Sequence, residues 1–290
     1  MTALLRSRRV RIGIALLGGF LLIALIGPWL VGDPLAFVGR PHQPPSIDHW
    51  FGTSGQGQDV FAQTVAGASV TRAVGFAVGL AVVVIAALLA LTAAFAGGWV
   101  DDALSVLVNV FLLIPGLPLA VVLAAYLPPG PRTIALVLIV TGWAWHARVL
   151  RAQALAVRQK EYIQASIVSG ESALRVIAVE MLPNLTPILA SSFIGATTYA
   201  ISAQVGLEFL GLGDPGVVSW GTNLYWAAND AALMTGSWWL FVPTGACIAL
   251  VGFALVLVNF GVDEVADPRL GAHGQGIGVC AATPVRRTDD

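Results

Sequence analysis

Charge is scarce in this sequence. Only 11% of its 290 residues are charged, whereas an average soluble domain is about a quarter charged. The composition is 57% hydrophobic, which excludes an ordinary soluble domain and indicates an integral membrane protein. The chain also has a single lysine, Lys160, and the preceding residues LAVRQK contain no glycine-rich phosphate loop. We therefore do not expect this polypeptide to bind ATP by a P-loop of its own.

Residues that bind metals or form disulfides are equally sparse. Cys247 falls in an apolar stretch and Cys280 near the C-terminus, so neither indicates a disulfide. No metal site with local ligand spacing is visible among the scattered histidines, which are His42, His49, His146 and His273. All sixteen acids fall at or beyond the ends of apolar stretches, leaving no obvious residue to couple transport to protons or sodium. We expect any energy input to come from elsewhere.

What the sequence does contain is a series of long apolar windows. A span across the bilayer core takes roughly 20 residues. Windows of that length predict transmembrane helices near residues 12–31, 73–97, 103–127, 133–150, 185–207 and 238–262. A signal peptide is the alternative for the first window, but its apolar run exceeds the roughly 7–15 residues of a signal core and no small-x-small cleavage site follows. We therefore expect a retained membrane anchor.

Positive charge predicts the orientation, because Lys and Arg near span ends stay on the cytoplasmic side. With the N-terminus inside, twelve cations fall in inside segments and three, Arg40, Arg72 and Arg132, fall outside. Six tryptophans lie near span ends, as expected of rings at the headgroup level. The expected fold class is an all-α integral membrane protein with six transmembrane helices and both termini in the cytoplasm.

Three longer polar segments interrupt the spans. The external segment 32–72 is rich in Pro and Gly, which predicts irregular structure leading into a short helix near 60–68. The others are a cytoplasmic segment at 161–184 and an external one at 208–230. We divide the chain into an anchor helix with its external segment (1–70), a five-helix core (71–265) carrying cytoplasmic helices at 158–182, and a tail (266–290) whose composition is typical of disorder.

The cytoplasmic segment, EYIQASIVSGESALRVIAVEMLPN, predicts two short helices. An apolar face recurs at helical spacing through Ile163, Ile167, Leu174, Ile177 and Met181. Gly170 can adopt the left-handed conformation that ends a helix, and Ser172 can cap the next one. Pro183 falls at the start of the fifth span, where its missing N–H costs least. Periodicity alone leaves open whether this face lies on lipid or docks against a protein.

This segment resembles the cytoplasmic coupling motif of ABC-importer permeases. It is most similar to the version in dipeptide, oligopeptide and nickel permeases, through Glu161, Tyr162, Ala165, Gly170, Ile177, Leu182, Pro183 and Asn184. Two positions depart from the family pattern. Ser166 stands where a second alanine is usual, and Glu180 stands where a basic or His-containing pair is common.

Other segments resemble the same family in the same order. HWFGTSGQGQDVFAQTVAGA is similar to its external segment, with Gln58 in place of an arginine, and GLEFLGLG followed by SWG is similar to its fifth-span exit, with Gln204 where a glutamate is usual. After GGWVD the chain has Val106 and Asn109 where the family usually carries charge. The closing signature is carried by Asn259, Gly261, Asp263, Asp267, Pro268 and Arg269. Together these identify the chain as similar to the C-type subunit of peptide importers.

The resemblance implies a type I ABC importer permease fold in a prokaryotic plasma membrane. The helix from Glu161 to Ser169 would sit in a groove of a cytoplasmic ATPase subunit, with Gly170 as its bend. A second homologous permease subunit would complete the pore, two ATPase subunits would bind ATP and Mg²⁺, and an extracytoplasmic binding protein would deliver peptides. Nickel or another small or chelated solute is the alternative cargo. A structural protein that has lost transport is the third alternative, because charge is missing at Val106 and Asn109.

Two further groups of residues have competing interpretations. Ser191, Thr198 and Ser202 share one helical face, with Gln204 near its outer end, which indicates either a polar pore stripe or helix packing. In the external segment 208–230, the resemblance implies contact with the binding protein through Trp220, Tyr225 and Trp226. Their chemistry alone fits interfacial anchors equally well.

Overall fold

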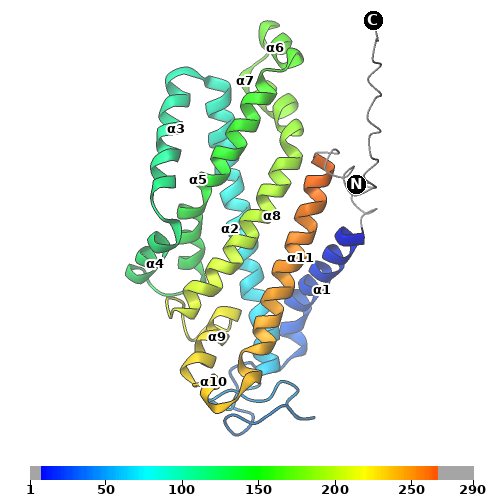
Figure 1. The fold of residues 1–290 in the computed structure, drawn as a ribbon, viewed down its shortest axis with the longest axis vertical. Helices are drawn as coiled ribbons and strands as arrows, with labels where there is room; N and C mark the ends of the chain where they lie inside the picture. The colour runs from blue at the N-terminus through cyan, green and yellow to red at the C-terminus, as the bar shows by residue number, and fades with distance from the viewer. Residues whose placement is uncertain (1–7, 267–290) are drawn as a thin grey trace, which may run out of the picture.

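The protein is a bundle of long helices (Figure 1). The computed structural model describes residues 8–266, with side chains described through residue 262. In that part of the chain, β structure is limited to two isolated bridges, Phe37 with Gln58 and Thr53 with Asp59. The helices are α1 (Arg8–Leu30), α2 (Val60–Ala96), α3 (Gly98–Leu113), α4 (Gly116–Tyr126), α5 (Pro131–Arg158), α6 (Glu161–Val168), α7 (Ala173–Arg175), a π-helix (Val176–Met181), α8 (Leu182–Phe209), α9 (Trp220–Asn229), α10 (Ala232–Thr235), a 3₁₀-helix (Trp238–Leu240) and α11 (Val242–Ala266).

The all-α membrane class is confirmed, with one correction to the third span. Among the described residues, five helical segments are long and apolar enough to cross a bilayer, and α3 with α4 makes a sixth only as a broken pair bent by 80°. The predicted single helix over 103–127 is therefore wrong. Pro115 has no N–H to continue the helix, and it disfavours helical geometry at Ile114, which is extended at φ −82 and ψ 126.

A second difference concerns α2. The predicted short helix at 60–68 and the span at 73–97 are one continuous helix, so no structural break exists at residue 70. Asp59 caps this helix, accepting a 3.0 Å hydrogen bond from the Ala62 N–H at Oδ1. No proline interrupts it, and Gly97, at φ +65, ends it. The helix thus extends beyond the predicted span toward the loop that precedes it.

The core lies where α2 packs against α5 and α8. Its members include Val78, Val82 and Ala86 from α2 with Ile134 and Leu138 from α5, all buried. Small residues let the α2 and α8 backbones approach closely, as is typical of helix packing in membranes. A methyl group added at Gly79 would collide with the Thr197 side chain of α8.

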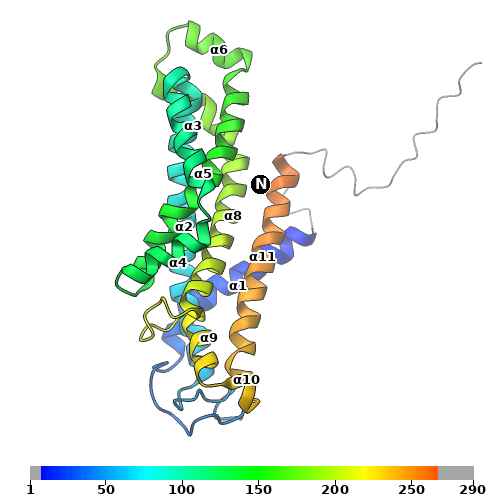
Figure 2. The same cartoon turned by 60° about the vertical axis from the view of Figure 1, so that its left-hand side comes forward.

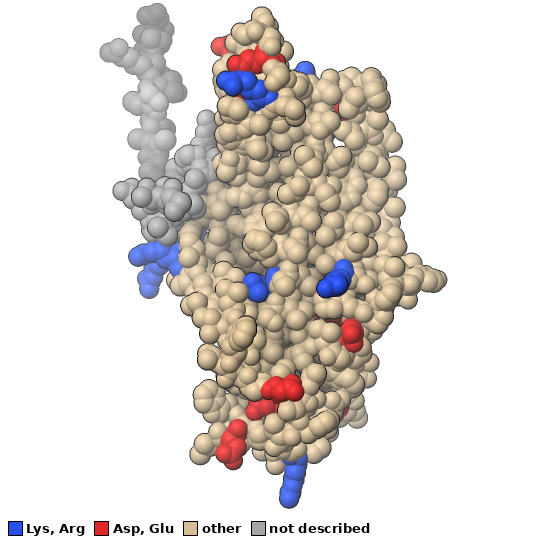
Figure 3. Space-filling view, turned by 180° about the vertical axis from the view of Figure 1, so that it is seen from behind, with Lys and Arg blue, Asp and Glu red and all other residues tan. Residues whose placement is uncertain are grey.

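The two ends of the bundle are different. α6 lies at one extreme end in both views, and the loop before α2 gathers with α9 and α10 at the other (Figures 1 and 2). α1 begins and α11 ends toward the α6 end (Figure 1). On the rear face a broad surface free of charged residues separates the charged tip from the charged lower part (Figure 3). This arrangement agrees with termini on one side, and which side is cytoplasmic stays a prediction.

Candidate functional site

The cytoplasmic segment begins with α6, and its helix, turn, helix prediction is confirmed at Gly170. Gly170 has φ +80 and follows the last turn of α6. The Glu171 N–H donates to the Ser166 carbonyl at 3.2 Å and the Gly170 N–H to the Ile167 carbonyl at 3.1 Å. These two bonds form a Schellman motif, which satisfies carbonyls at the end of a helix. Ser172 stands at the N-cap of α7, although its side chain makes no capping hydrogen bond.

One face of α6 is anchored in the bundle. Ile163 is fully buried in a cluster with Val176, Met181 and Leu185, while Ile167 and Ile177 pack against that cluster. Leu174 does not share this face, because its side chain is 81% exposed. The predicted apolar face is therefore wrong at Leu174. The π-helix Val176–Met181 that follows changes the angular spacing of side chains, so the regular helical count does not hold through this stretch.

The opposite face of α6 points away from the bundle. Glu161, Tyr162, Ala165, Val168 and Ser169 are exposed. Val168 is 86% exposed and Tyr162 is 45% exposed, so the face is partly apolar. We call these five residues the α6 outer face. Isolated exposed apolar residues are common, but here they lie together at the extreme tip of the molecule.

The segment continues without a break into α8. α7, the π-helix and α8 form one continuous helical stretch, Ala173–Phe209. Pro183 lies in the interior of this continuous stretch. Pro187 has no N–H, so it leaves the Pro183 carbonyl without its usual helical donor. The Thr186 hydroxyl donates to that carbonyl at 2.9 Å. Pro187 is therefore tolerated in a helix that continues from α7 through α8, so a displacement at α7 would move α8 directly.

A side-chain hydrogen bond joins α6 to the π-helix. The Ser166 hydroxyl donates to Glu180 Oε1 at 2.7 Å. These are the two positions at which the segment departs from the family pattern. Each departing residue is therefore the partner of the other. Together with the buried Ile163, this bond fixes α6 against the helix that leads into α8.

The predicted pore-lining residues divide into exposed and buried positions on α8. Ser202 is exposed, on a face shared with Gly195, Tyr199 and Gly206. Thr198 is half-buried, and its hydroxyl donates to the Ile194 carbonyl at 2.8 Å.

Ser191 and Gln204 do not lie on this exposed face. The Ser191 hydroxyl donates to Asn259 Oδ1 of α11 at 3.0 Å, which is a packing contact. Gln204 is fully buried, so the prediction that it lines a pore is contradicted in this structure. Its amide donates to Glu208 Oε1 at 3.0 Å, one turn further along the same helix.

Glu208 is the centre of a buried polar network that fixes α9. It is 2% exposed and accepts a short hydrogen bond of 2.5 Å from the Ser219 hydroxyl. Ser219 and Thr222 form a capping box at the start of α9. Gln204, which stands where the resemblance leads one to expect a glutamate, thus donates its amide to the carboxylate of Glu208. Sequence reasoning missed this network, although the four-residue spacing of Gln204 and Glu208 was a visible signal.

The external aromatic residues also differ in exposure. Trp220 is 1% exposed, and its indole N–H donates to the Thr64 carbonyl at 2.9 Å. Its predicted contact with a binding protein, and equally an interfacial role, is therefore contradicted in this structure. Tyr225 and Trp226 are partly exposed and stack edge to face at 5.5 Å between ring centroids. For these two residues both interpretations stay open.

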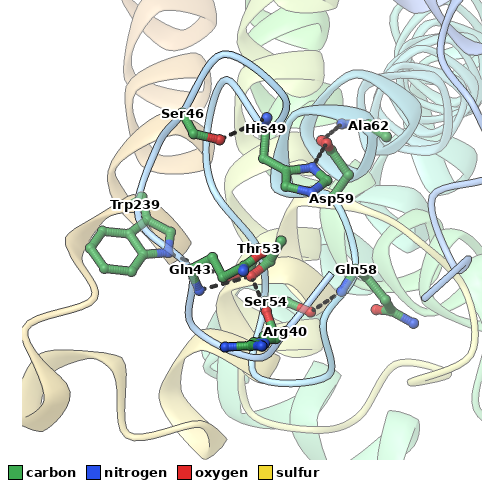
Figure 4. A network of polar contacts seen from close by, with 10 residues as sticks. All are labelled: Arg40, Gln43, Ser46, His49, Thr53, Ser54, Gln58, Asp59, Ala62 and Trp239. Atoms are coloured by element: carbon green, nitrogen blue, oxygen red, sulfur yellow. Dashed lines mark hydrogen bonds and ion pairs between the residues drawn. The ribbon is translucent and has the colours of Figure 1, made fainter. Parts of the chain in front are cut away.

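The external loop is irregular, as predicted, but it is held by side chains (Figure 4). His49 Nδ1 contacts Asp59 Oδ2 at 3.0 Å, beside the cap of α2. Thr53 accepts from the Gln43 N–H at 2.9 Å and donates to the Arg40 carbonyl at 2.6 Å. Gln58, which replaces a family arginine, donates to the Leu35 carbonyl at 3.1 Å. The loop therefore forms a fixed layer over the start of α2.

Two arginines of α5 contact α3, the helix that carries Val106 and Asn109 where the family usually has charged residues. Arg151 makes a bidentate pair with Asp101, both N···O distances being 2.6 Å. Arg148 donates to Asn109 Oδ1 at 3.4 Å, and Val106 is 62% exposed. The α3–α5 connection thus keeps one strong ion pair despite the neutral Asn109. Of the closing signature, the side chain of Asp263 and residues 267–269 lie outside what the structure describes.

Comparison with known proteins agrees with these features. A family described as binding-protein-dependent transport system inner membrane component matches residues 83–271. A putative peptide transport system permease protein of Brucella suis biovar 1 (strain 1330) is 33% identical over 276 residues, covering 93% of this chain and 91% of that protein. The dipeptide transport system permease protein of Bacillus subtilis (strain 168) is 33% identical over 271 residues, covering 91% and 83%. The oligopeptide transport system permease protein of the same organism is 33% identical over 232 residues, covering 79% and 74%.

Proposed function

Because the chain belongs to the family of binding-protein-dependent transport system inner membrane components, as a multi-pass protein of the prokaryotic plasma membrane, we propose that it is a permease subunit of an ATP-driven peptide importer. It would form half of the translocation path together with a second permease subunit. An extracytoplasmic binding protein would deliver the peptide. Two cytoplasmic ATPase subunits would bind ATP and Mg²⁺. Peptides are favoured over nickel as cargo because the relatives above are named for peptide, dipeptide and oligopeptide transport.

The observation that carries this proposal is the construction of α6. Its inner face is anchored by the buried Ile163, and its outer face, including Val168, is exposed. The position of this face at the tip supports a soluble partner over the lipid surface (Figure 2). An ATPase that binds α6 more tightly in one conformation would shift the population of permease states, as any ligand with differential affinity does.

The test is to charge the α6 outer face. We expect Val168→Glu to abolish co-purification of the ATPase subunits and ATP-dependent peptide uptake into proteoliposomes, because a carboxylate would be desolvated in an apolar groove. Met234→Glu is the matched control, since Met234 is 90% exposed at the opposite end of the molecule. ATPase binding by Val168→Glu at the wild-type level would remove α6 from the coupling mechanism.

A further inference from the structure

A cavity opens beside the elbow between α3 and α4, near the middle of α5 and α8. Its volume is about 510 Å³, and it is open to the surface. Ile114 and Pro115 line it from the elbow, Thr141 and His146 from α5, and Gly195 and Tyr199 from α8. Ligand pockets in proteins typically measure about 300–1,000 Å³. The cavity is therefore large enough to hold part of a ligand.

The elbow itself indicates that this cavity contains water. At membrane depth, non-helical backbone is tolerated only where it is covered by protein or lines a water-filled cavity. The extended Ile114 and the uncapped start of α4 interrupt the backbone here, and Pro115 supplies no side-chain hydrogen bond to it. Both Ile114 and Pro115 are exposed. Lipid alone would leave these backbone groups unsatisfied.

The polar side chains of the cavity support the same conclusion. An ionisable residue within a span is costly and usually functional. Neither the His146 ring nor the Tyr199 hydroxyl has a hydrogen-bond partner in the described part of the chain. Thr141 donates to the Val137 carbonyl at 2.9 Å, which leaves its oxygen free to accept. Three polar side chains from two helices thus converge on one space.

The exposed face of α8 extends the cavity and differs from the lipid-facing surfaces. On α11 the exposed residues Phe253 and Phe260 are large and apolar, at 55% and 63% exposure. On α8 the exposed positions after Tyr199 are the small residues Ser202 and Gly206, before the helix ends at the exposed Phe209. A small and polar stripe is a poor surface for hydrocarbon, whereas it suits a path that contains water and substrate.

We propose that this cavity is the half-site through which this subunit contacts the peptide backbone during transit. His146, Tyr199 and Thr141 would hydrogen-bond peptide amides, and Phe111 and Trp145 would supply apolar contact area. No Asp, Glu, Lys or Arg is among the residues that line it. The site therefore does not select peptides by side-chain charge. This inference rests on the proposed function of peptide import.

Accessibility to a thiol reagent tests whether the cavity is wet. In a complex carrying Cys247→Ser and Cys280→Ser, we expect Tyr199→Cys and Ser202→Cys to react with a small hydrophilic methanethiosulfonate. Peptide supplied during turnover should slow both reactions. Ala200→Cys is the control, because Ala200 is fully buried. Absence of reaction at Tyr199→Cys and Ser202→Cys in every nucleotide state would overturn the proposal, whether lipid or the partner subunit covers the face.

Charge selectivity tests the site directly. We expect His146→Leu to raise the KM for uptake of acidic, neutral and basic peptides alike by about fivefold, the factor that one lost hydrogen bond of roughly 1 kcal/mol gives. His146→Gln should restore part of the effect, because its side-chain amide can still hydrogen-bond a peptide amide. Thr141→Asp should favour basic over acidic peptides, while the control Thr141→Asn should not.

The possible failures are distinguishable. If the wild-type complex takes up no peptide, the proposed function fails. If the wild-type complex takes up peptide and the Thr141 and His146 variants match it in KM and charge preference, only the half-site is wrong. Co-purification of the ATPase subunits verifies that each variant is folded and assembled.

Discussion

At the scale of single residues, one hydrogen bond joins the two side chains of the cytoplasmic segment that depart from the family pattern. Ser166 and Glu180 are fourteen positions apart, yet their side chains meet at 2.7 Å between α6 and the π-helix. A hydrogen bond to a charged group contributes about 1.5–3 kcal/mol, with less expected where water reaches it. Ser166 is partly exposed, so we expect the lower part of that range. The bond would keep α6 and α8 moving together.

The first prediction concerns this pair. Ser166→Ala and Glu180→Leu should each reduce peptide transported per ATP hydrolysed, because α6 could then move without α8. Glu180→Gln should retain much of the coupling, since its amide oxygen still accepts from Ser166. The double variant Ser166→Ala/Glu180→Leu should be no worse than Glu180→Leu alone. Additive losses in the transport-to-ATPase ratio would show that the two side chains act independently.

At the scale of elements, the turn after α6 depends on backbone conformation rather than on space. Gly170 has φ +80, and nothing lies within 4 Å of a Cβ added there. A Cβ at this position would therefore meet no neighbour, and its cost is the left-handed conformation itself, about 1 kcal/mol or more for a residue other than Gly or Asn. The turn sets the direction in which α7 leaves α6.

The second prediction concerns substitutions at Gly170. Gly170→Trp or Gly170→Val should abolish transport and the stimulation of ATPase activity, with membrane insertion intact. Gly170→Asn should keep most transport, because Asn tolerates the left-handed region. Uptake assays and ATPase assays on the same proteoliposomes measure both. Normal uptake by Gly170→Val would mean that the turn does not transmit force.

The close contact of α2 with α8 depends on a glycine, which has no side chain, at position 79. A methyl group at Gly79 would collide with Thr197, which is itself buried. We predict that Gly79→Ala destabilises the protein by about 1–3 kcal/mol through overpacking. Gly252→Ala in α11 is the matched control, because nothing lies within 4 Å of an added Cβ there, and it should be neutral. Thermal unfolding in detergent would measure both, and equal melting temperatures would refute the close packing.

The elements also show what sequence could and could not predict. Hydropathy located every span, because burial in lipid needs only length and apolar composition. It missed the elbow at Pro115, since an apolar window does not reveal a bend. Helical periodicity also assigned Leu174 to a buried face. That assignment assumes 3.6 residues per turn, and the π-helix departs from this value. The Gly170 turn was predictable because its cause is local.

The candidate sites divide in the same way. Gly170 and the anchoring Ile163 follow from local chemistry and periodicity. Tyr199 and His146 could not be paired from sequence, because they lie on different helices and meet only through the packing of α5 with α8. Gln204 illustrates the opposite error. Its polarity suggested a pore, but the structure buries it against Glu208.

At the scale of the whole molecule, the distribution of charge predicts which end faces the cytoplasm. Twelve of fifteen cations lie in segments assigned to the inside, and the loop before α2 and α6 lie at opposite ends of the bundle (Figure 1). Ile47 in that loop is 93% exposed, and Leu174 beside α6 is 81% exposed. We predict that, in a variant without native cysteines, Ile47→Cys reacts with an impermeant maleimide on spheroplasts. Leu174→Cys should react only after permeabilisation. The reverse pattern would place α6 outside, where no ATPase could reach it, and would overturn both the orientation and the coupling role of α6.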